Sequence, residues 1–438
     1  MIDPTLLEES PPSPNVGPIG RHLLPDSAVV TSVDRLELAA VDVVSVADEF
    51  GTPVFVYDEE TIRARCRETL AAFGPGVAYA TKAFLCKAIA QIVLEEGMSL
   101  DVSTQGELEF ALAAGARPDR IVLHGNNKSD SELSSGFALG VGRIVVDSFD
   151  EIRRIERMTE SRRRQHLLVR VNPGVEAHTH EFVATGKVDS KFGFSIGSGA
   201  AEAAINALKS IRGVELVGIH AHIGSQIFRL DAFERAVAAL APLVAKHDFG
   251  ELCVGGGVGV AYLTDETAPT IADWGATVRA SCRLVGIPST VRVTAEPGRA
   301  IVATAGMTCY RVGTIKELPG VRNYIAVDGG MSDNPRPVLY GSGYEAFLPR
   351  EAGADRPYRA RIVGKHCESG DIVVADGRLP ADVTVGDVLA TPVTGAYGFA
   401  MASNYNRVGR PAVVFVREGK AREVVRRETS EDLLRLEP

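Results

Sequence analysis

The strongest constraint on the fold is a repeat of eight short β-branched runs. Each is followed by a polar or glycine-containing loop and then by an alanine- and leucine-rich helical stretch. The runs lie at 77–80, 99–102, 120–124, 143–147, 166–171, 216–222, 251–254 and 291–295. Alternating strand and helix predicts parallel pairing, because a parallel neighbour is reached only through a crossover. Eight such units in about 220 residues are typical of a closed (β/α)8 TIM-like barrel. An open doubly wound sheet is the alternative.

The sequence changes character after Arg299. Short apolar runs there are separated by proline- and glycine-rich turns, a pattern typical of a mostly antiparallel β domain. We expect its strands at 301–317, 323–327, 359–365, 371–375, 388–391 and 412–417. A strand predicted at 53–57 precedes the first barrel unit and is expected to join the same sheet. The predicted parts are a flexible N-terminal arm (1–25), a segment joining the C-terminal β domain (26–57), the barrel (58–304) and the β domain (305–438).

Composition excludes several classes of protein. Of the 438 residues, 45% are hydrophobic and 24% charged, as in ordinary soluble proteins. A net charge of −9 argues against a nucleic-acid partner. The chain shows neither a long uninterrupted apolar run nor a signal peptide with a basic start and an apolar core, so we expect no membrane partner. Six cysteines without C-x-x-C spacing favour free thiols in a cytoplasmic protein.

Polar or glycine residues follow every predicted barrel strand. In a barrel these carboxyl ends share one mouth, where barrel enzymes carry their active sites. Lys82 follows the first strand, and a lone lysine there is more often a solvated surface charge than a reactive amine. The other seven strand ends favour the reactive interpretation. They carry Asp101, His124, Asp147, Arg170 with Asn172, His220 with His222 and Ser225, the glycines 255–257, and Glu296 with Gly298 and Arg299.

The glycines and Glu296 indicate the kind of ligand. Gly255, Gly256, Gly257 and Gly298 expose backbone N–H groups after strands seven and eight, the usual barrel position for a phosphate, although a glycine triplet can also be a simple tight turn. The carboxylate of Glu296 would repel a phosphate unless it faced a cation, and a protonated ring nitrogen meets that condition. Phosphate, ring nitrogen and reactive lysine together specify pyridoxal 5′-phosphate.

Metal binding is the weaker interpretation of the histidines. His220 and His222 share one face of a strand, but no third ligand stands at a suitable spacing. We favour stacking on the cofactor ring for His222 and a hydrogen-bonded place inside the barrel for His220. The pair His178 and His180 lies in a loop, and no metal is predicted there either.

The predicted β domain supplies further candidates. Cys367 stands next to Glu368, and a thiol beside a carboxylate is a candidate proton donor, with a buried inert cysteine as the alternative. Arg336 follows a glycine-rich loop and offers a guanidinium, with surface pairing as its alternative. Tyr397 follows a turn of small residues and offers a phenol, unless it only packs in the core.

These motifs resemble those of the diaminopimelate decarboxylases, pyridoxal-phosphate enzymes with an alanine-racemase-like barrel and a β domain. The resemblance runs from about residue 50 to the C-terminus. It rests on YATKA (79–83), HGNNKS (124–129), KFG (191–193), HIGSQ (222–226), GGG (255–257), EPGR (296–299), DGGMSDN (328–334), KHCESGD (365–371) and GAY (395–397). The run Gly398, Phe399 and Ala400 departs from the family pattern and bears on packing near the cofactor.

The resemblance implies a role for each matching residue. Lys82 would hold the cofactor as a Schiff base and Cys367 would donate a proton, so these two are the catalytic residues. Cofactor-binding residues would be His222 stacked on the ring, Glu296 on the pyridine nitrogen, and Ser225, Gly257, Gly298 and Tyr397 around the phosphate, together with Arg299. The substrate-binding residues would be Arg299, Arg336, Tyr340, Glu368 and Tyr397. The family's active sites form between two subunits of a homodimer.

The implied reaction is the decarboxylation of meso-2,6-diaminopimelate to L-lysine and carbon dioxide, the last step of lysine biosynthesis. A related decarboxylase of ornithine or arginine is a runner-up, although those substrates lack the distal carboxylate that two arginines would bind. An enzyme for another carboxylated amino acid is a second alternative. A non-catalytic pyridoxal-phosphate carrier belongs to a different class, and the domain with Cys367 and Glu368 argues against it.

Overall fold

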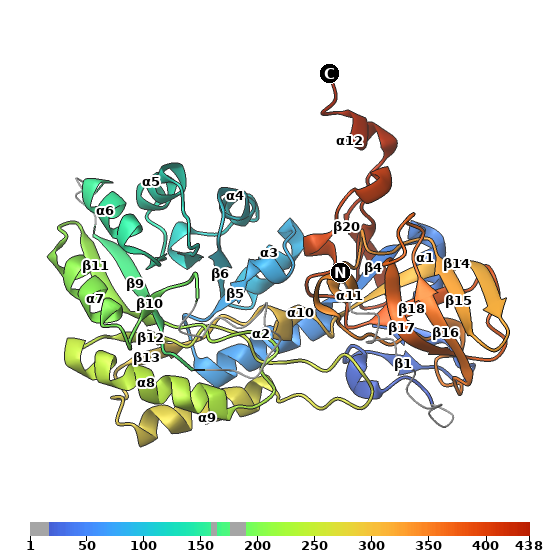
Figure 1. Cartoon of the computed structure of the whole chain (residues 1–438), viewed down its shortest axis with the longest axis horizontal. Coiled ribbons are helices and arrows are strands. Elements are labelled where there is room, and N and C mark those ends of the chain that lie inside the picture. The colour runs from blue at the N-terminus through green and yellow to red at the C-terminus, as the bar shows by residue number, and fades with distance from the viewer. Residues whose placement is uncertain (1–16, 159–163, 176–189) are drawn as a thin grey trace.

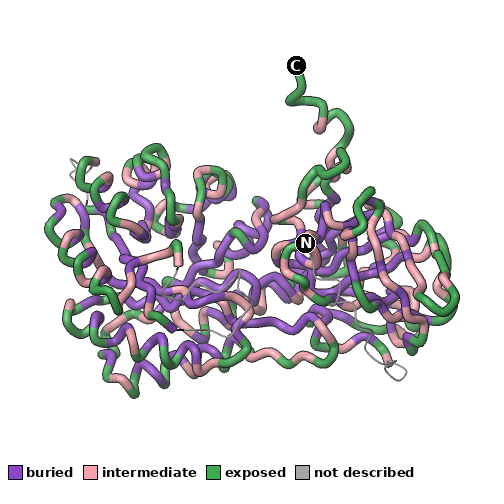
Figure 2. The backbone as a smooth tube through the Cα atoms, viewed as in Figure 1, coloured by how far each residue is buried: buried purple, intermediate pink, exposed green. Residues whose placement is uncertain are grey.

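The computed structural model describes residues 17–158, 164–175 and 190–438. Two bodies lie side by side along the long axis of the molecule (Figure 1). A ring of strands wrapped in helices forms one body, and a β domain built from the N-terminal and C-terminal parts of the chain forms the other. Buried residues run through both bodies (Figure 2). Most of the buried apolar side chains belong to one continuous core.

The barrel contains the eight predicted strands. In spatial order they are β5 (Ala78–Ala80), β6 (Ser99–Val102), β7 (Ile121–Leu123), β8 (Arg143–Val146), β9 (Gln165–Asn172), β11 (Val214–His220), β12 (Glu251–Cys253) and β13 (Arg292–Thr294). Every neighbouring pair is parallel. The ring is completed where Ala78 N–H donates to Ala295 O and Ala80 N–H to Pro297 O, both at 3.1 Å. The predicted barrel is confirmed, and the open sheet is excluded.

Helices cover the outside of the ring (Figure 1). They are α2 (Glu59–Phe73), α3 (Lys87–Glu95), α4 (Gln105–Ala113), α5 (Asp130–Leu139), α6 (Phe149–Met158), α7 (Ala200–Ser210), α8 (Asp231–His247) and α9 (Ile271–Leu284). Side-chain caps start several of them: Ser129 and Thr270 each form a capping box. None of the helices in the described residues is both long enough and apolar enough to cross a lipid bilayer.

The β domain is organised around the long strand β14 (Gly306–Leu318). Its sheet runs β17-β16-β15-β14-β4-β19-β20, and β18 also pairs with β14. The remaining bounds are β4 (Val54–Asp58), β15 (Arg322–Val327), β16 (Tyr358–Val363), β17 (Ile372–Leu379), β18 (Val388–Pro392), β19 (Ala412–Arg417) and β20 (Lys420–Val425). Pairing is antiparallel except between β15 and β16 and between β4 and β19.

Some boundaries differ from the predicted ones. The strand expected at 301–317 begins only at Gly306, because Arg299–Val302 forms one turn of helix, α10. The buried run Ile301 to Ala303 suits a helical turn as well as a strand, and periodicity does not separate the two in so short a segment. Strand β20 and the C-terminal helix α12 (Ser430–Leu434) were not predicted. Helix α12 projects away from the body (Figure 1).

The N-terminal part of the described chain packs on the β domain. Strands β1 (Val29–Val30), β2 (Leu36–Leu38) and β3 (Val41–Asp42) form a small antiparallel sheet that leads into helix α1 (Val43–Phe50). The chain then enters the large sheet as β4, antiparallel to β14 and parallel to β19. Strand β4 runs directly into α2 of the barrel, so this strand and helix link the two bodies.

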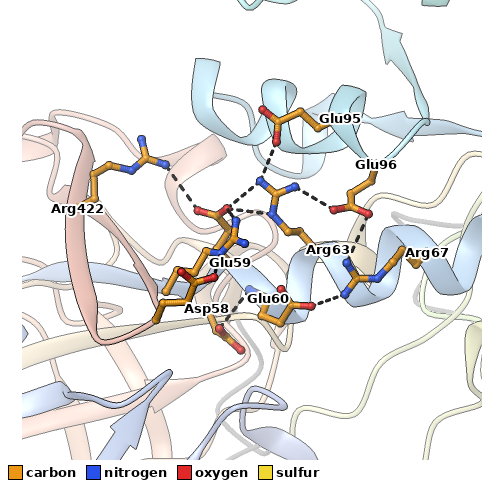
Figure 3. A network of polar contacts seen from close by, with 10 residues as sticks. Asp58, Glu59, Glu60, Arg63, Arg67, Glu95, Glu96 and Arg422 are labelled. Carbon is orange, nitrogen blue, oxygen red and sulfur yellow. Dashed lines mark hydrogen bonds and ion pairs between the residues drawn. The ribbon is translucent and has the colours of Figure 1, made fainter.

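Ion pairs reinforce this link. Glu59, at the first position of α2, is buried, and its carboxylate contacts Arg63 at 2.8 Å, Arg417 at 3.0 Å and Arg422 at 3.6 Å. Arg63 also reaches Glu95 and Glu96 at the end of α3. The network therefore joins strands β19 and β20 of the β domain to two barrel helices (Figure 3).

Candidate active site

A cavity of about 490 Å³ opens at the carboxyl ends of the barrel strands. Its lining combines strand-end residues of the barrel with residues of the β domain, so both bodies build it. The lining includes Lys82, Asp101, Ser103, His124, Arg170, Phe192, His222, Ser225, Gln226 and Arg299 from the barrel and Arg336, Tyr340, Tyr397 and Met401 from the β domain. Most of the side chains predicted for the site are therefore brought together in one place.

Lys82 lies in a short 3-10 turn that directly follows β5. Helix α3 starts only at Lys87, so the lysine stands on a tight turn between strand and helix. The hydroxyl of Thr81 donates to the carbonyl of Asp101 at 2.7 Å and ties this turn to β6. Desolvation at the barrel mouth opposes the charge on the ammonium, but Asp101, Tyr397 and Glu296 together outweigh it, and the pKa of Lys82 lies above its ordinary value.

Glu296 lies between two histidines. Its Oε1 is 3.0 Å from Nε2 of His124, and its Oε2 is 2.9 Å from Nε2 of His220. Burial would raise the pKa of Glu296, but the two imidazoles hold it well below the usual range. Burial also lowers the pKa of His220, to about 4, whereas the carboxylates of Asp101 and Glu296 raise that of His124. The favoured interpretation of His220 as a hydrogen-bonded interior residue is confirmed.

His222 is a neutral imidazole at the wall of the cavity. The backbone N–H of Gly256 donates to its Nδ1 at 3.2 Å, which leaves the hydrogen on Nε2. Burial, reinforced by Lys82 and Arg170, holds the pKa of His222 well below its ordinary value. A flat, uncharged ring fixed by a backbone donor is suited to stacking against an aromatic ligand.

The glycines allow backbone segments to approach one another. A Cβ on Gly257, where φ is +108°, would lie 2.0 Å from the carbonyl oxygen of Gly224, so the loops after β11 and β12 touch backbone to backbone. A Cβ on Gly298 would lie 2.9 Å from the carbonyl oxygen of Ala80, at the turn that carries Lys82. Ser225 stands beside this region and accepts a hydrogen bond from Nη2 of Arg299 at 3.1 Å.

Two buried arginines each donate a hydrogen bond to a tyrosine hydroxyl. Nη1 of Arg299 donates to the hydroxyl of Tyr262 at 2.6 Å, and Arg336 donates to the hydroxyl of Tyr344. Both guanidiniums are at least nine-tenths buried, and within the described residues neither forms an ion pair with a carboxylate. Nε of Arg299 is buried without a hydrogen-bond partner there. Buried cations in this state form a site for anions.

Tyr397 reaches the cavity from an unusual backbone conformation. Its φ is +60°, and its backbone N–H donates to the carbonyl of Ala83 at 2.8 Å, next to the turn of Lys82. The guanidinium of Arg299 lies 4.7 Å from the centre of its ring. Phe399 belongs to the run 398–400 that departs from the family pattern. Its ring packs edge-on against Phe84 of the barrel, so this run fills the junction between the two bodies.

Cys367 and Glu368 do not line this cavity. Both are exposed on the loop between β16 and β17. Neighbouring side chains order this loop: His366 contacts Ser332 at 2.8 Å and Asn406 at 3.1 Å. The alternative of a buried, inert thiol at position 367 is wrong, whereas the other five cysteines are buried and free.

Several residues around the site were given no specific role by the sequence. Asp101, His124, Arg170 and Phe192 line the cavity, and Tyr262 and Tyr344 support the two arginines. The first three were visible as polar strand ends. The tyrosines gave no local signal, because only the meeting of the two bodies brings them to the arginines. Of the histidines considered for metal, His178 and His180 lie outside the described residues.

The donor set fits pyridoxal phosphate. The amine of Lys82, the neutral imidazole of His222 and the guanidinium of Arg299 line one cavity. The carboxylate of Glu296 lies behind this lining and is hydrogen-bonded to His124, which does line it, while Gly257 packs against the carbonyl of Gly224, next to Ser225. These groups match the aldehyde, ring nitrogen, ring face and phosphate of that cofactor. The fold and the site together define a pyridoxal-phosphate enzyme built on a barrel and a β domain.

Comparison with known proteins agrees with this class of enzyme. Residues 59–303 match the family model described as "Pyridoxal-dependent decarboxylase, pyridoxal binding domain". The diaminopimelate decarboxylase of Mycobacterium tuberculosis is 47% identical, with 97% of this chain and 98% of that protein covered. That of Bacillus subtilis is 44% identical over 92% and 95% of the two chains. A crystal structure of the M. jannaschii enzyme in complex with L-lysine superposes with a TM-score of 0.87 at 30% identity, covering 94% and 98%. The chain belongs to the diaminopimelate decarboxylase family.

Proposed function

We propose that this chain decarboxylates meso-2,6-diaminopimelate to L-lysine and carbon dioxide, with pyridoxal phosphate as cofactor, as a cytoplasmic homodimer. One observation carries the choice of substrate. The cavity that holds the reactive amine also holds Arg299 and Arg336, two buried guanidiniums without a carboxylate partner among the described residues. A substrate with a carboxylate at its far end would neutralise such a group, and arginine binds a carboxylate through two parallel hydrogen bonds.

The barrel residues would hold the cofactor. Lys82 would bind its aldehyde, His222 would stack on its ring, and Glu296 would keep a proton at its ring nitrogen. Ser225, Gly257, Gly298 and Arg299, together with Tyr397 from the β domain, would surround its phosphate. When bound, pyridoxal phosphate supplies an electron sink for the pair of electrons that remains when carbon dioxide leaves.

The remaining residues would act on the substrate. Arg336 and Tyr340, together with Arg299 and Tyr397, would orient the distal carboxylate and amine. The thiol of Cys367 would deliver a proton to the carbon that lost its carboxylate, a step to which general acid catalysis contributes roughly 10²–10⁴-fold. Cys367 and Glu368 are exposed away from the cavity of their own chain, and this location supports a role in the site of a partner subunit.

A substrate panel tests this proposal. Release of carbon dioxide is measured from meso-diaminopimelate, L-lysine, ornithine and arginine at equal concentrations. We expect turnover with diaminopimelate alone, because the other three substrates leave the buried guanidiniums unpaired. Clear preference for ornithine or arginine would overturn the substrate assignment. Failure to turn over any amino acid, with cofactor bound, would favour a carrier.

The shared site is tested by mixing two inactive variants. Lys82→Ala lacks the reactive amine, and Cys367→Ala lacks the proton donor. In a shared-site homodimer, a hybrid of the two variants contains one intact site, so a refolded equal mixture should recover about a quarter of wild-type activity. Mass spectrometry shows whether hybrids have formed. If hybrids are present and the mixture is as inactive as its components, each site lies within one chain.

A further inference from the structure

The carboxylate of Glu296 is held on both of its oxygens. His124 contacts Oε1 and His220 contacts Oε2, each through Nε2 and at hydrogen-bond distance. Each oxygen of an ionised carboxylate can accept two hydrogen bonds, so Glu296 keeps acceptor capacity for a third donor. We propose that His220 is a positioning residue: as a neutral imidazole that donates from Nε2, it keeps Glu296 ionised and oriented for a protonated ring nitrogen. This inference rests on the cofactor role proposed for Glu296.

The surroundings of His220 favour the neutral tautomer with its hydrogen on Nε2. Its side chain is 2% exposed, and its Nδ1 is buried without a hydrogen-bond partner in the described part of the chain. A hydrogen on Nδ1 would be a buried, unsatisfied donor and would leave two acceptors, Nε2 and Oε2, facing each other at 2.9 Å. Only the tautomer with its hydrogen on Nε2 avoids both costs.

Charge also distinguishes His220 from His124. Nε2 of His124 lies 3.7 Å from Asp101 and 3.0 Å from Glu296, so two carboxylates favour its protonation. The two imidazole rings are edge to face, with centres 4.9 Å apart, and Arg170 adds further positive charge. Burial first, and then positive charge on these two neighbours, disfavour an imidazolium at position 220, which agrees with the low pKa of His220.

The Nε2 donor also explains why a histidine suits this position.

Three side chains that could ligate a metal, His124, His220 and Glu296, have their ligand atoms within 4.8 Å of one another. Their separations of 2.9 and 3.0 Å are those of hydrogen bonds, and these bonds already engage both oxygens of the carboxylate. Glutamine can place an amide N–H near the position of Nε2, whereas leucine fills a similar space without a donor.

The first test needs neither cofactor nor substrate. The wild-type protein is labelled with ¹⁵N-histidine, freed of cofactor and studied by NMR at pH 7, with the signals of His220 assigned from His220→Gln. We expect a neutral ring with the hydrogen on Nε2. A charged ring, or a hydrogen on Nδ1, would overturn the proposal.

The second test measures affinity for pyridoxal phosphate by equilibrium titration of the cofactor-free protein. His220→Leu should bind the cofactor about tenfold more weakly, the loss expected for one buried hydrogen bond to a charged group. His220→Gln should stay within about threefold of wild type. Equal affinity for wild type and the leucine variant would overturn the proposal, as would a glutamine variant as weak as the leucine variant. Carbon dioxide release by the wild type tests the proposed reaction separately, because neither readout here depends on turnover.

Discussion

The guanidinium of Arg336 lies over the ring of Tyr262, with 4.3 Å between Cζ and the ring centre. The hydroxyl of the same tyrosine accepts a hydrogen bond from Arg299. One side chain therefore supports both cations through two different interactions, a cation–π contact and a charge-assisted hydrogen bond. The two contributions can be separated by substitution.

Tyr262→Phe keeps the ring face and removes only the acceptor for Arg299. We expect KM for diaminopimelate to rise about tenfold, the effect of one hydrogen bond to a charged group. Tyr262→Leu removes both contacts and should raise KM further. KM is measured by steady-state kinetics, and absorbance checks that each variant contains bound cofactor. Equal kinetics for the phenylalanine variant and wild type would show that the hydroxyl does not orient Arg299.

Arg336→Lys keeps a positive charge but loses the planar guanidinium. The substrate carboxylate would lose its paired hydrogen bonds, so we expect kcat/KM to fall by roughly 30-fold or more while cofactor content stays unchanged. Arg311→Ala is the control, because Arg311 forms a surface ion pair with Asp48 away from the cavity. Unchanged turnover by the Arg336 variant would make this residue structural only.

Lys82→Ala should abolish the near-visible absorbance of lysine-bound pyridoxal phosphate. Its neighbour on the next helix, Lys87, is exposed, and Lys87→Ala should keep the band and the activity. Absorbance spectra after dialysis make the comparison. A band retained by the Lys82 variant would refute its covalent role.

Asp333 should make stability depend on pH. Burial raises the pKa of this carboxyl to about 7, whereas in the unfolded chain it titrates near 4. Between these values the folded state binds the extra proton, so the contribution of Asp333 to stability is present at low pH and is lost as pH rises from about 4 to about 7. Each tenfold difference in proton affinity between the folded and unfolded states corresponds to about 1.4 kcal/mol.

Asp333→Asn isolates this contribution. Its amide can still accept from the N–H of Gly330 and donate to Tyr310, the two groups that Asp333 contacts at 2.7 Å. Relative to the variant, the wild type should lose a few kcal/mol of unfolding free energy between pH 5 and pH 8. Urea denaturation at both pH values gives the difference. Parallel pH curves for the two proteins would contradict the raised pKa of Asp333.

Arg63→Ala tests the link between the two bodies. The carboxylate of Glu59 would stay buried with weaker compensation from Arg417 and Arg422, and we expect a loss of about 1–3 kcal/mol in unfolding free energy. Arg67→Ala, one turn further along α2, is the matched control. Arg67 is half exposed and pairs with Glu60 and, at 3.5 Å, with Glu96 at the edge of the network, but it does not contact Glu59, so its loss should cost about 0–1 kcal/mol. Equal losses would show that burial of the network adds nothing.

The sequence by itself determined the barrel. Each of the eight β-branched runs overlaps a strand, because strand and helix alternate over short distances and local periodicity encodes that alternation. It also determined which barrel side chains face the cavity, since residues at the carboxyl ends of parallel strands must share one mouth. Lys82, His222, Ser225 and Arg299 were found in this way.

Only the tertiary structure decided the contacts that depend on distant segments. His124, His220 and Glu296 come from three different strand ends, and Tyr262 meets Arg336 across the junction of the barrel and the β domain. Hydrogen-bond partners and protonation depend on positions set by packing within a few tenths of an ångström, and no local pattern of residues records them. The charge state of the site is for this reason a property of the fold.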